Sequence, residues 1–197
     1  MMKKVGILGG TFNPPHIGHL VMANEVLHAL QLDEVRLMPN AIPPHKQHRA
    51  DATPEQRVRM LELFIGETPK LSIEMIELER GGRSYTFETM RALREREPDV
   101  QFYFIIGGDS VAELHTWYRI DELVQLVTFV GVNRPGTVAQ SAYAVQMVQT
   151  PEIDLSSTLL RTRLAAGQSV QYLIHDTVID YIREEGLYGT RDITGGN

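Results

Sequence analysis

The most informative segment of the chain reads Gly9-Gly10-Thr11-Phe12-Asn13-Pro14-Pro15-His16-Ile17-Gly18-His19. The apolar run before it, residues 5–8, predicts a short buried strand, and residues 20–27 after it are typical of an amphipathic helix. A strand that ends at two glycines and leads into a helix brings exposed backbone amides to the positive end of a helix dipole. Proteins bind phosphate groups at such places, so the segment predicts a nucleotide site.

The two histidines of this segment strengthen the prediction. His16 and His19 are three residues apart, so on the first turn of a helix both imidazoles lie on one face. Backbone amides, a helix dipole and two imidazoles would then meet where a polyphosphate could lie. A zinc site is the alternative interpretation of the pair, but no third ligand accompanies it at a suitable spacing. We therefore expect no metal site built from side chains.

Two better-known phosphate loops are excluded. The chain has no G-x-x-x-x-G-K-[ST] run, and no G-x-G-x-x-G follows a predicted strand. What remains is the H-x-G-H pattern of His16-Ile17-Gly18-His19, preceded by Gly-Gly-Thr-Phe. This combination resembles the nucleotidylyltransferase superfamily, and the resemblance implies that the motif binds the phosphates of a nucleoside triphosphate.

Composition narrows the class of protein. The 197 residues are 43% hydrophobic and 22% charged, which is typical of one globular domain. We place that domain at residues 1–188 and a polar tail at 189–197. The net charge of −6 argues against nucleic acid or an anionic membrane as a partner. The absence of cysteine, of a signal-peptide pattern and of any apolar run near ~18 residues predicts a cytoplasmic protein.

Strand-like and helix-like segments alternate along the whole chain. This alternation predicts an α/β fold, a Rossmann-like doubly wound parallel sheet with helices on both faces. The predicted strands are residues 4–8, 34–38, 71–77, 100–106, 127–132 and 144–149. The predicted helices are residues 18–30, 54–65, 86–97, 110–114, 121–126, 158–166 and 177–185.

A short sequence pattern is repeated at the ends of two of the predicted strands. Ile7-Leu8-Gly9-Gly10-Thr11 and Ile105-Ile106-Gly107-Gly108-Asp109 both end a buried strand in two glycines and a polar residue. Ligands of open parallel sheets bind beyond the carboxyl ends of strands, where the strand order reverses. We therefore predict that these two strands are neighbours and that both glycine pairs face one crevice.

A second candidate phosphate site lies in Asp154-Leu155-Ser156-Ser157-Thr158-Leu159-Leu160-Arg161. Ser157 is a natural helix cap, and Arg161 follows one turn later on the same face. Hydroxyls, amides and a guanidinium suit triphosphate oxygens, although a capped helix with a surface arginine is an alternative interpretation. The spacing matches the second superfamily signature, I-S-S-T-x-x-R, with Leu155 in the isoleucine position.

A finer resemblance, to the bacterial nicotinate-nucleotide adenylyltransferases, covers nearly the whole chain. It rests on the first motif, residues 39–46 (Pro-Asn-Ala-Ile-Pro-Pro-His-Lys), Ser84-Tyr85-Thr86, Gly107-Gly108-Asp109 and Trp117. Asn13 stands where many superfamily members have aspartate. The resemblance implies that the phosphate of nicotinate mononucleotide attacks the α-phosphorus of ATP, with Mg²⁺ held mainly by the triphosphate.

The candidate residues follow from the motifs and the resemblance. The catalytic candidates are His16, His19, Lys46 and Arg161. The ATP-binding candidates are Gly9, Gly10, Thr11, Phe12, His16, Gly18, His19, Gly107, Asp109, Ser156, Ser157, Thr158 and Arg161. The candidates for binding nicotinate mononucleotide are Asn40, Lys46, Tyr85, Thr86, Gly108, Asp109, Trp117 and Arg134.

Several of these residues have a second interpretation. Lys46 could belong to a solvated loop, and Trp117 could be part of the core rather than a stacking surface for a pyridine ring. Thr86 could be a plain helix cap rather than a donor to the ring carboxylate. Asp109 could bind ribose hydroxyls, orient a magnesium-bound water or cap the next helix. Residues 40–52 form a long connection that we expect to close over the acceptor.

Other functions remain open from sequence alone. The acceptor could be nicotinamide mononucleotide, pantetheine phosphate or a phosphorylated alcohol. Nicotinate and nicotinamide are hard to distinguish, since a carboxylate differs from an amide by one charge and backbone amides can bind either. A nucleotide-sensing module without turnover is the alternative from a different class. A homodimer is expected only from the family resemblance.

Overall fold

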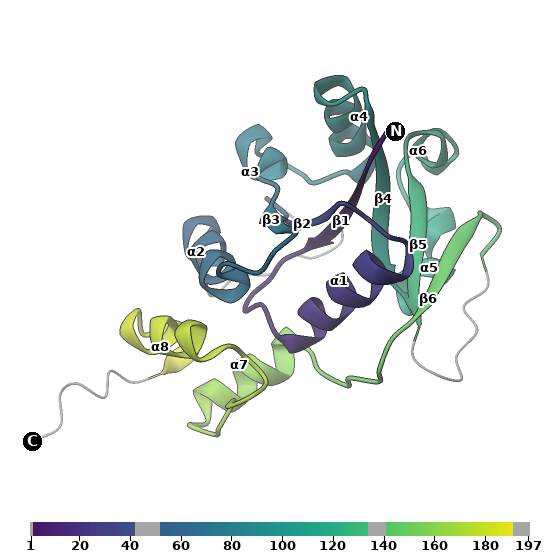
Figure 1. Cartoon of the computed structure of the whole chain (residues 1–197). Helices are drawn as coiled ribbons and strands as arrows, with labels where there is room; N and C mark the ends of the chain where they lie inside the picture. Colours follow the sequence, from purple (N-terminus) through teal and green to yellow (C-terminus); the bar gives the residue numbers. More distant parts are fainter. Residues whose placement is uncertain (1, 42–51, 134–140, 191–197) are drawn as a thin grey trace, which may run out of the picture.

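The computed structural model describes residues 2–41, 52–133 and 141–190. Its centre is a six-stranded parallel sheet in the order β3-β2-β1-β4-β5-β6 (Figure 1). The strands are β1 Lys3–Gly10, β2 Glu34–Pro39, β3 Leu71–Ile73, β4 Val100–Gly107, β5 Thr128–Asn133 and β6 Val145–Gln149. This order is that of the doubly wound dinucleotide-binding fold. The predicted fold class is confirmed.

Helices cover both faces of the sheet. They are α1 Ile17–Ala29, α2 Pro54–Ile65, α3 Ile76–Arg80, α4 Thr86–Arg96, α5 Gly108–Ala112, α6 Ile120–Leu126, α7 Ser157–Ala165 and α8 Asp176–Glu184. Two short 3-10 turns, η1 Leu114–Thr116 and η2 Leu187–Gly189, complete the described elements. In Figure 1, α1 lies along the sheet. The helices α7 and α8 lie beyond the amino-terminal end of α1, and α8 is next to α2.

Alternating side chains of the central strands divide the core into two layers. On β4, Tyr103 and Ile105 pack with α1, α2, α7 and α8. Phe102, Phe104 and Ile106 of the same strand pack with α3, α4, α5 and α6 on the other face. Because both faces of the sheet are covered, its central strands β1 and β4 contain nearly continuous buried runs.

The two strands that end in glycine pairs are neighbours, as predicted. β1 pairs with β4 in parallel, with Leu8 opposite Ile105. The strand order reverses between them, since β2 and β3 extend to one side of β1 while β5 and β6 extend beyond β4. The loops after β1 and β4 therefore leave the sheet at its switch point, where ligands of such folds bind.

One predicted strand is partly wrong. Residues 71–77 were expected to be extended, but β3 stops at Ile73 and a short helix, α3, begins at Ile76. The buried carboxylate of Glu74 accepts a hydrogen bond from the backbone N–H of Ile76 at 3.2 Å, which satisfies an otherwise free donor at the start of that helix. Local capping by Glu74 thus ends the strand where apolar spacing alone suggested that it continues.

The other predicted elements are confirmed to within a few residues. Thr53 caps α2 as predicted: its hydroxyl accepts from the Gln56 N–H at 3.2 Å, and the Gln56 side chain accepts from the Thr53 N–H at 3.0 Å. No helix in the described ranges is long and apolar enough to cross a membrane.

Candidate active site

The loop between β1 and α1 is held in place by side chains from the last third of the chain. Arg161 donates to the carbonyl of Asn13 at 2.9 Å, and the Ser157 hydroxyl donates to the carbonyl of Pro14 at 2.9 Å. The buried Tyr188 hydroxyl donates to Oδ1 of Asn13 at 2.5 Å. The two signature segments, far apart in sequence, therefore meet at one loop, as the nucleotide-site prediction requires.

The start of α7 corrects one residue assignment. Sequence reasoning placed the helix cap at Ser157, but Ser156 is the cap, and its hydroxyl accepts from the Leu159 N–H at 3.2 Å. Ser157 is the first helical residue, which frees its hydroxyl to reach the loop after β1. Thr158 accepts from Arg161 at 3.3 Å, so the arginine is oriented by its own helix.

His16 and His19 lie against each other at the start of α1. Their ring centroids are 3.8 Å apart, and the rings are tilted by 33°. The backbone N–H of His16 donates to Nδ1 of His19 at 3.1 Å. An imidazole that accepts at Nδ1 carries its proton on Nε2 when neutral, so His19 presents Nε2–H as a donor. The edge of Phe12 packs on His19 at 4.9 Å and fixes that ring from a second side.

Both imidazoles are held in the neutral form. Burial lowers the pKa of His16 to about 4. Burial, with the neighbouring His16 as a smaller cause, holds the pKa of His19 well below its usual value. A bound polyphosphate would reverse this effect, because a nearby anion favours the protonated imidazole. An anion bound beside the pair would therefore raise the pKa of both imidazoles.

Glycine is required inside the H-x-G-H motif for a steric reason. A Cβ on Gly18 would lie 3.1 Å from Nδ1 and 3.2 Å from Cε1 of His16. Any larger residue would therefore push the His16 ring out of its place. Gly107, at the end of β4, differs because a Cβ there would meet no atom within 4 Å, so the space above this strand end is open.

Three of the candidate acceptor residues, Asn40, Tyr85 and Thr86, lie around the end of β2. The Asn40 N–H donates to the Gly10 carbonyl at 3.0 Å, and its side-chain amide lies 3.3 Å from Thr11 Oγ1. The Ala41 N–H donates to Ser84 Oγ at 3.0 Å. Asn40 and the Ser84-Tyr85-Thr86 segment are thus brought side by side, next to the loop after β1.

The structure contradicts one of the two interpretations of Thr86. Tyr85 occupies the cap position of α4 and Thr86 is its first residue, so the plain-cap interpretation of Thr86 is wrong. The Tyr85 ring packs on Tyr118 at 4.9 Å between centroids. Thr86 therefore lies at a helix start whose first amides need an acceptor.

Trp117 is half-buried on the α4 side of the sheet. It packs edge-to-face on Phe104 at 6.0 Å and on Phe129 at 5.8 Å between centroids. Phe104 in turn is the nearest neighbour that a Cβ on Gly9 would meet, at 3.3 Å. Trp117 thus lies at the margin of the core, and the ring of Phe104 separates it from Gly9 at the end of β1.

Asp109 is exposed in the first turn of α5. The cap of that helix is Gly107, so the interpretation of Asp109 as the cap is wrong. Gly108 is the first helical residue, next to it. Within the described ranges, no group of three or more histidines or carboxylates could hold a metal ion. Lys46, Arg134 and most of the predicted closing loop lie outside the described residues.

Arg57 is a functional candidate that sequence reasoning missed. It extends from α2, is 2% exposed, and donates to the carbonyls of Thr11 at 2.9 Å and Asn40 at 2.7 Å. The available signal was periodicity: Arg57 precedes Met60, Leu61 and Phe64 by three, four and seven residues, on the buried face of α2. A charge at such a position needs a buried partner.

Unsatisfied polar atoms mark the same place. Three buried side-chain atoms in the described part of the chain have no hydrogen-bond partner: Nδ1 of His16, Oδ1 of Asn40 and Nε of Arg57. All three belong to residues around the loops after β1 and β2. Buried polar groups without partners are rare in native proteins, and a ligand at this site would supply partners.

Comparison with known proteins points the same way. The family model described as cytidylyltransferase-like matches residues 7–163. The chain is 48% identical over 187 residues to the nicotinate-nucleotide adenylyltransferase of Bacillus subtilis (strain 168), covering 95% of this chain and 99% of that one. It is 54% identical over 190 residues to a probable nicotinate-nucleotide adenylyltransferase of Geobacillus thermodenitrificans (strain NG80-2), covering 96% and 88%.

A solved structure supports the fold. The chain resembles the nicotinic acid mononucleotide adenylyltransferase of Plasmodium falciparum complexed with NaAD, with a TM-score of 0.79 and 20% identity. The match covers 96% of this chain and 98% of that one.

Proposed function

The chain belongs to the nicotinate-nucleotide adenylyltransferases of the cytidylyltransferase-like family, and we propose that it transfers the adenylyl group of ATP to nicotinate mononucleotide. The products are nicotinate adenine dinucleotide and pyrophosphate. One observation carries the proposal: Ser157 and Arg161 bond to the carbonyls of Pro14 and Asn13, which joins both phosphate-binding signatures at the switch point of the sheet.

The reaction needs little acid–base chemistry from the protein. The attacking phosphate is already an anion at neutral pH, because its second pKa is about 6. Its oxygen forms a bond to the α-phosphorus of ATP while the bond to pyrophosphate breaks. Catalysis then depends on in-line placement of the two substrates and on neutralising charge at the triphosphate.

The histidine pair suits the charge that develops at the reacting phosphorus. Its rings are neutral without ligand and gain affinity for protons beside an anion, so they donate hydrogen bonds to triphosphate oxygens. The amides at the start of α7 and the Arg161 guanidinium bind the oxygens of the leaving pyrophosphate. Lys46 is proposed to bind the incoming phosphate.

Enzymes of this family generally use a divalent metal with ATP, and we propose Mg²⁺. Magnesium is usually held by one or two carboxylates together with substrate phosphates. Here the triphosphate would hold most of the ion, and the exposed Asp109, at the start of α5 beyond β4, would orient a magnesium-bound water. The described residues contain no group of three or more histidines or carboxylates that could form a cage for the ion. When bound, the ion neutralises charge on the triphosphate.

The acceptor is proposed to bind between the ends of β2 and β4. Trp117 stacks on the pyridine ring, and the first amides of α4 at Tyr85 and Thr86 bind its carboxylate. Asn40 and Gly108 are proposed to contact the acceptor as well. Arg134 is included as an acceptor-binding residue on the basis of the sequence alone. We also retain a cytoplasmic location and a homodimer from the sequence and the family resemblance.

The test is pyrophosphate release by the purified protein with Mg-ATP. Nicotinate mononucleotide, nicotinamide mononucleotide and pantetheine phosphate are compared as acceptors in parallel. We expect turnover that strongly favours the nicotinate form. Comparable turnover of both mononucleotides would remove the carboxylate selectivity, and tight ATP binding without pyrophosphate release would indicate a sensing module.

A further inference from the structure

Arg57 connects the two loops to which the proposed function assigns different substrates. Its Nη1 donates to the carbonyl of Thr11, in the loop that precedes the histidine pair, at 2.9 Å. Its Nη2 donates to the carbonyl of Asn40, at the end of β2 on the acceptor side, at 2.7 Å. One planar guanidinium thus spans the ATP side and the acceptor side.

The other links between these loops are one backbone hydrogen bond and one longer contact between two side chains. The Asn40 N–H bonds to the Gly10 carbonyl at 3.0 Å, which continues the β1–β2 pairing. The side-chain contact of Asn40 with Thr11 is long, at 3.3 Å, and both atoms can rotate. Among the described residues, Arg57 is the charged side chain that bonds to both loops.

The position also requires arginine rather than any cation. A guanidinium presents donors on separate nitrogens in one rigid plane, whereas an ammonium carries its three donors on a single rotatable nitrogen and does not fix the relation between two carbonyls. Arg57 is 2% exposed and forms no ion pair with a carboxylate within the described ranges. Burying a cation whose partners are two carbonyls is costly, so stability alone does not explain this residue.

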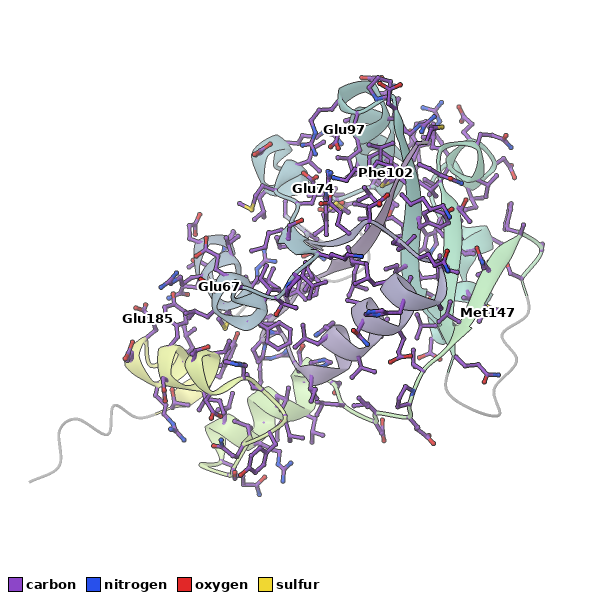
Figure 2. The ribbon with its side chains drawn as sticks, viewed as in Figure 1. Glu67, Glu74, Glu97, Phe102, Met147 and Glu185 are labelled. Atoms are coloured by element: carbon purple, nitrogen blue, oxygen red, sulfur yellow. The ribbon has the colours of Figure 1, made fainter. Side chains whose placement is uncertain are left out.

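Arg36 offers a contrast within the same protein. It is also largely buried, but it bonds to three carboxylates, those of Glu34, Glu74 and Glu97. Figure 2 labels Glu74 and Glu97 beside α3 and α4, on the side of the sheet opposite α2. Arg36 therefore stabilises the fold without touching either loop.

We infer that Arg57 is a positioning residue for adenylyl transfer, which sets the loop holding the triphosphate relative to the loop holding the acceptor. The inference rests on the proposed function for the identity of the two substrates. Loss of the guanidinium leaves each loop able to bind its own substrate but misplaces the attacking oxygen relative to the α-phosphorus. A misplacement of about 1 Å costs roughly 10²-fold in rate.

The test compares Arg57→Lys with Arg36→Lys, because both changes keep the charge and remove a planar fork. Turnover per folded enzyme and both KM values are measured at a temperature where all proteins are fully folded. For Arg57→Lys we expect kcat to fall at least ~10-fold while each KM changes less than ~3-fold. For Arg36→Lys we expect a lower Tm with unchanged kcat. Arg57→Met removes the charge as well as the guanidinium and should lower kcat further. If Arg57→Met does not fold, the result for Arg57→Lys alone tests the inference.

A second readout does not depend on activity. Amide hydrogen exchange at Asn40, relative to Val35 near the start of β2, should become faster in Arg57→Lys and stay unchanged in Arg36→Lys. Equal kcat per folded enzyme in Arg57→Lys and the wild type would overturn the inference, as would unchanged exchange at Asn40. Absence of wild-type turnover with every acceptor would instead refute the proposed function, and the exchange data would then decide about Arg57 alone.

Discussion

Replacing Gly18 by alanine should separate activity from stability. The added Cβ would lie 3.1 Å from Nδ1 of His16, whereas ordinary contact begins at 3.4 Å, so the imidazole must move by at least 0.3 Å. Because the ring also packs against His19 at 3.8 Å, the movement disturbs the arrangement of the histidine pair. If a misplacement of about 1 Å costs roughly 10²-fold and the logarithm of the rate scales with the shift, we expect kcat to fall about 4-fold.

The same substitution should increase the free energy of unfolding slightly or leave it almost unchanged. Gly18 is the second residue of α1, and alanine is favoured over glycine within helices by up to about 1 kcal/mol. This gain offsets the strain against His16. We therefore expect the free energy of unfolding to stay within about 1 kcal/mol of the wild type while activity falls.

The assay is steady-state pyrophosphate release, together with urea unfolding of the same preparations. Ala29→Gly is the matched control, since it makes the reverse exchange at the exposed last residue of α1. It should lower stability slightly and leave kcat unchanged. A Gly18→Ala enzyme with kcat within twofold of the wild type would refute the steric explanation of this glycine.

Three further predictions concern the same site. His16→Ala and His19→Ala should each lower kcat by ~10²-fold or more, and single-turnover rates within a few-fold of the wild type would argue against transition-state stabilisation by the pair. Trp117→Ala should raise KM for nicotinate mononucleotide with little change in KM for ATP, whereas equal effects on both would identify a purely structural residue. Stability should fall as the pH is lowered from 6.5 to about 4, because the unfolded chain binds protons at His16 and His19 there and the native chain does not. In unfolding titrations His16→Asn should reduce that slope, and an unchanged slope would show that burial of His16 does not contribute to it.

The fold could be predicted because its signals are local and repeated. The alternation of strands and helices, and the glycine pairs after β1 and β4, fixed the parallel sheet and the neighbouring position of those two strands. The β3–α3 boundary could not be predicted in this way. It depends on the Glu74 carboxylate, which also bonds to Arg36 and Arg96 from distant elements.

The parts of the candidate site that belong to a sequence motif could be predicted. The residues that reach the site only through tertiary packing could not. The H-x-G-H segment and the Ser156–Arg161 segment are local patterns, and both lie where the sequence placed them relative to a helix start, apart from the shift of the cap to Ser156. Arg57 and Tyr188 belong to no motif. Their roles arise from bonds to residues 46 and 175 positions away, which only the folded arrangement of α2 and η2 creates.

The bond between Tyr188 and Asn13 has a consequence for biosynthesis. The loop that follows β1 is translated among the first residues, yet its asparagine receives its hydrogen bond from a tyrosine 175 positions later. Arg161 and Ser157 are likewise translated long after the carbonyls to which they bond. A nascent chain therefore holds the complete histidine motif without its supports until the last helical turn has left the ribosome. Nucleotide binding should accordingly appear at the end of translation rather than gradually during it.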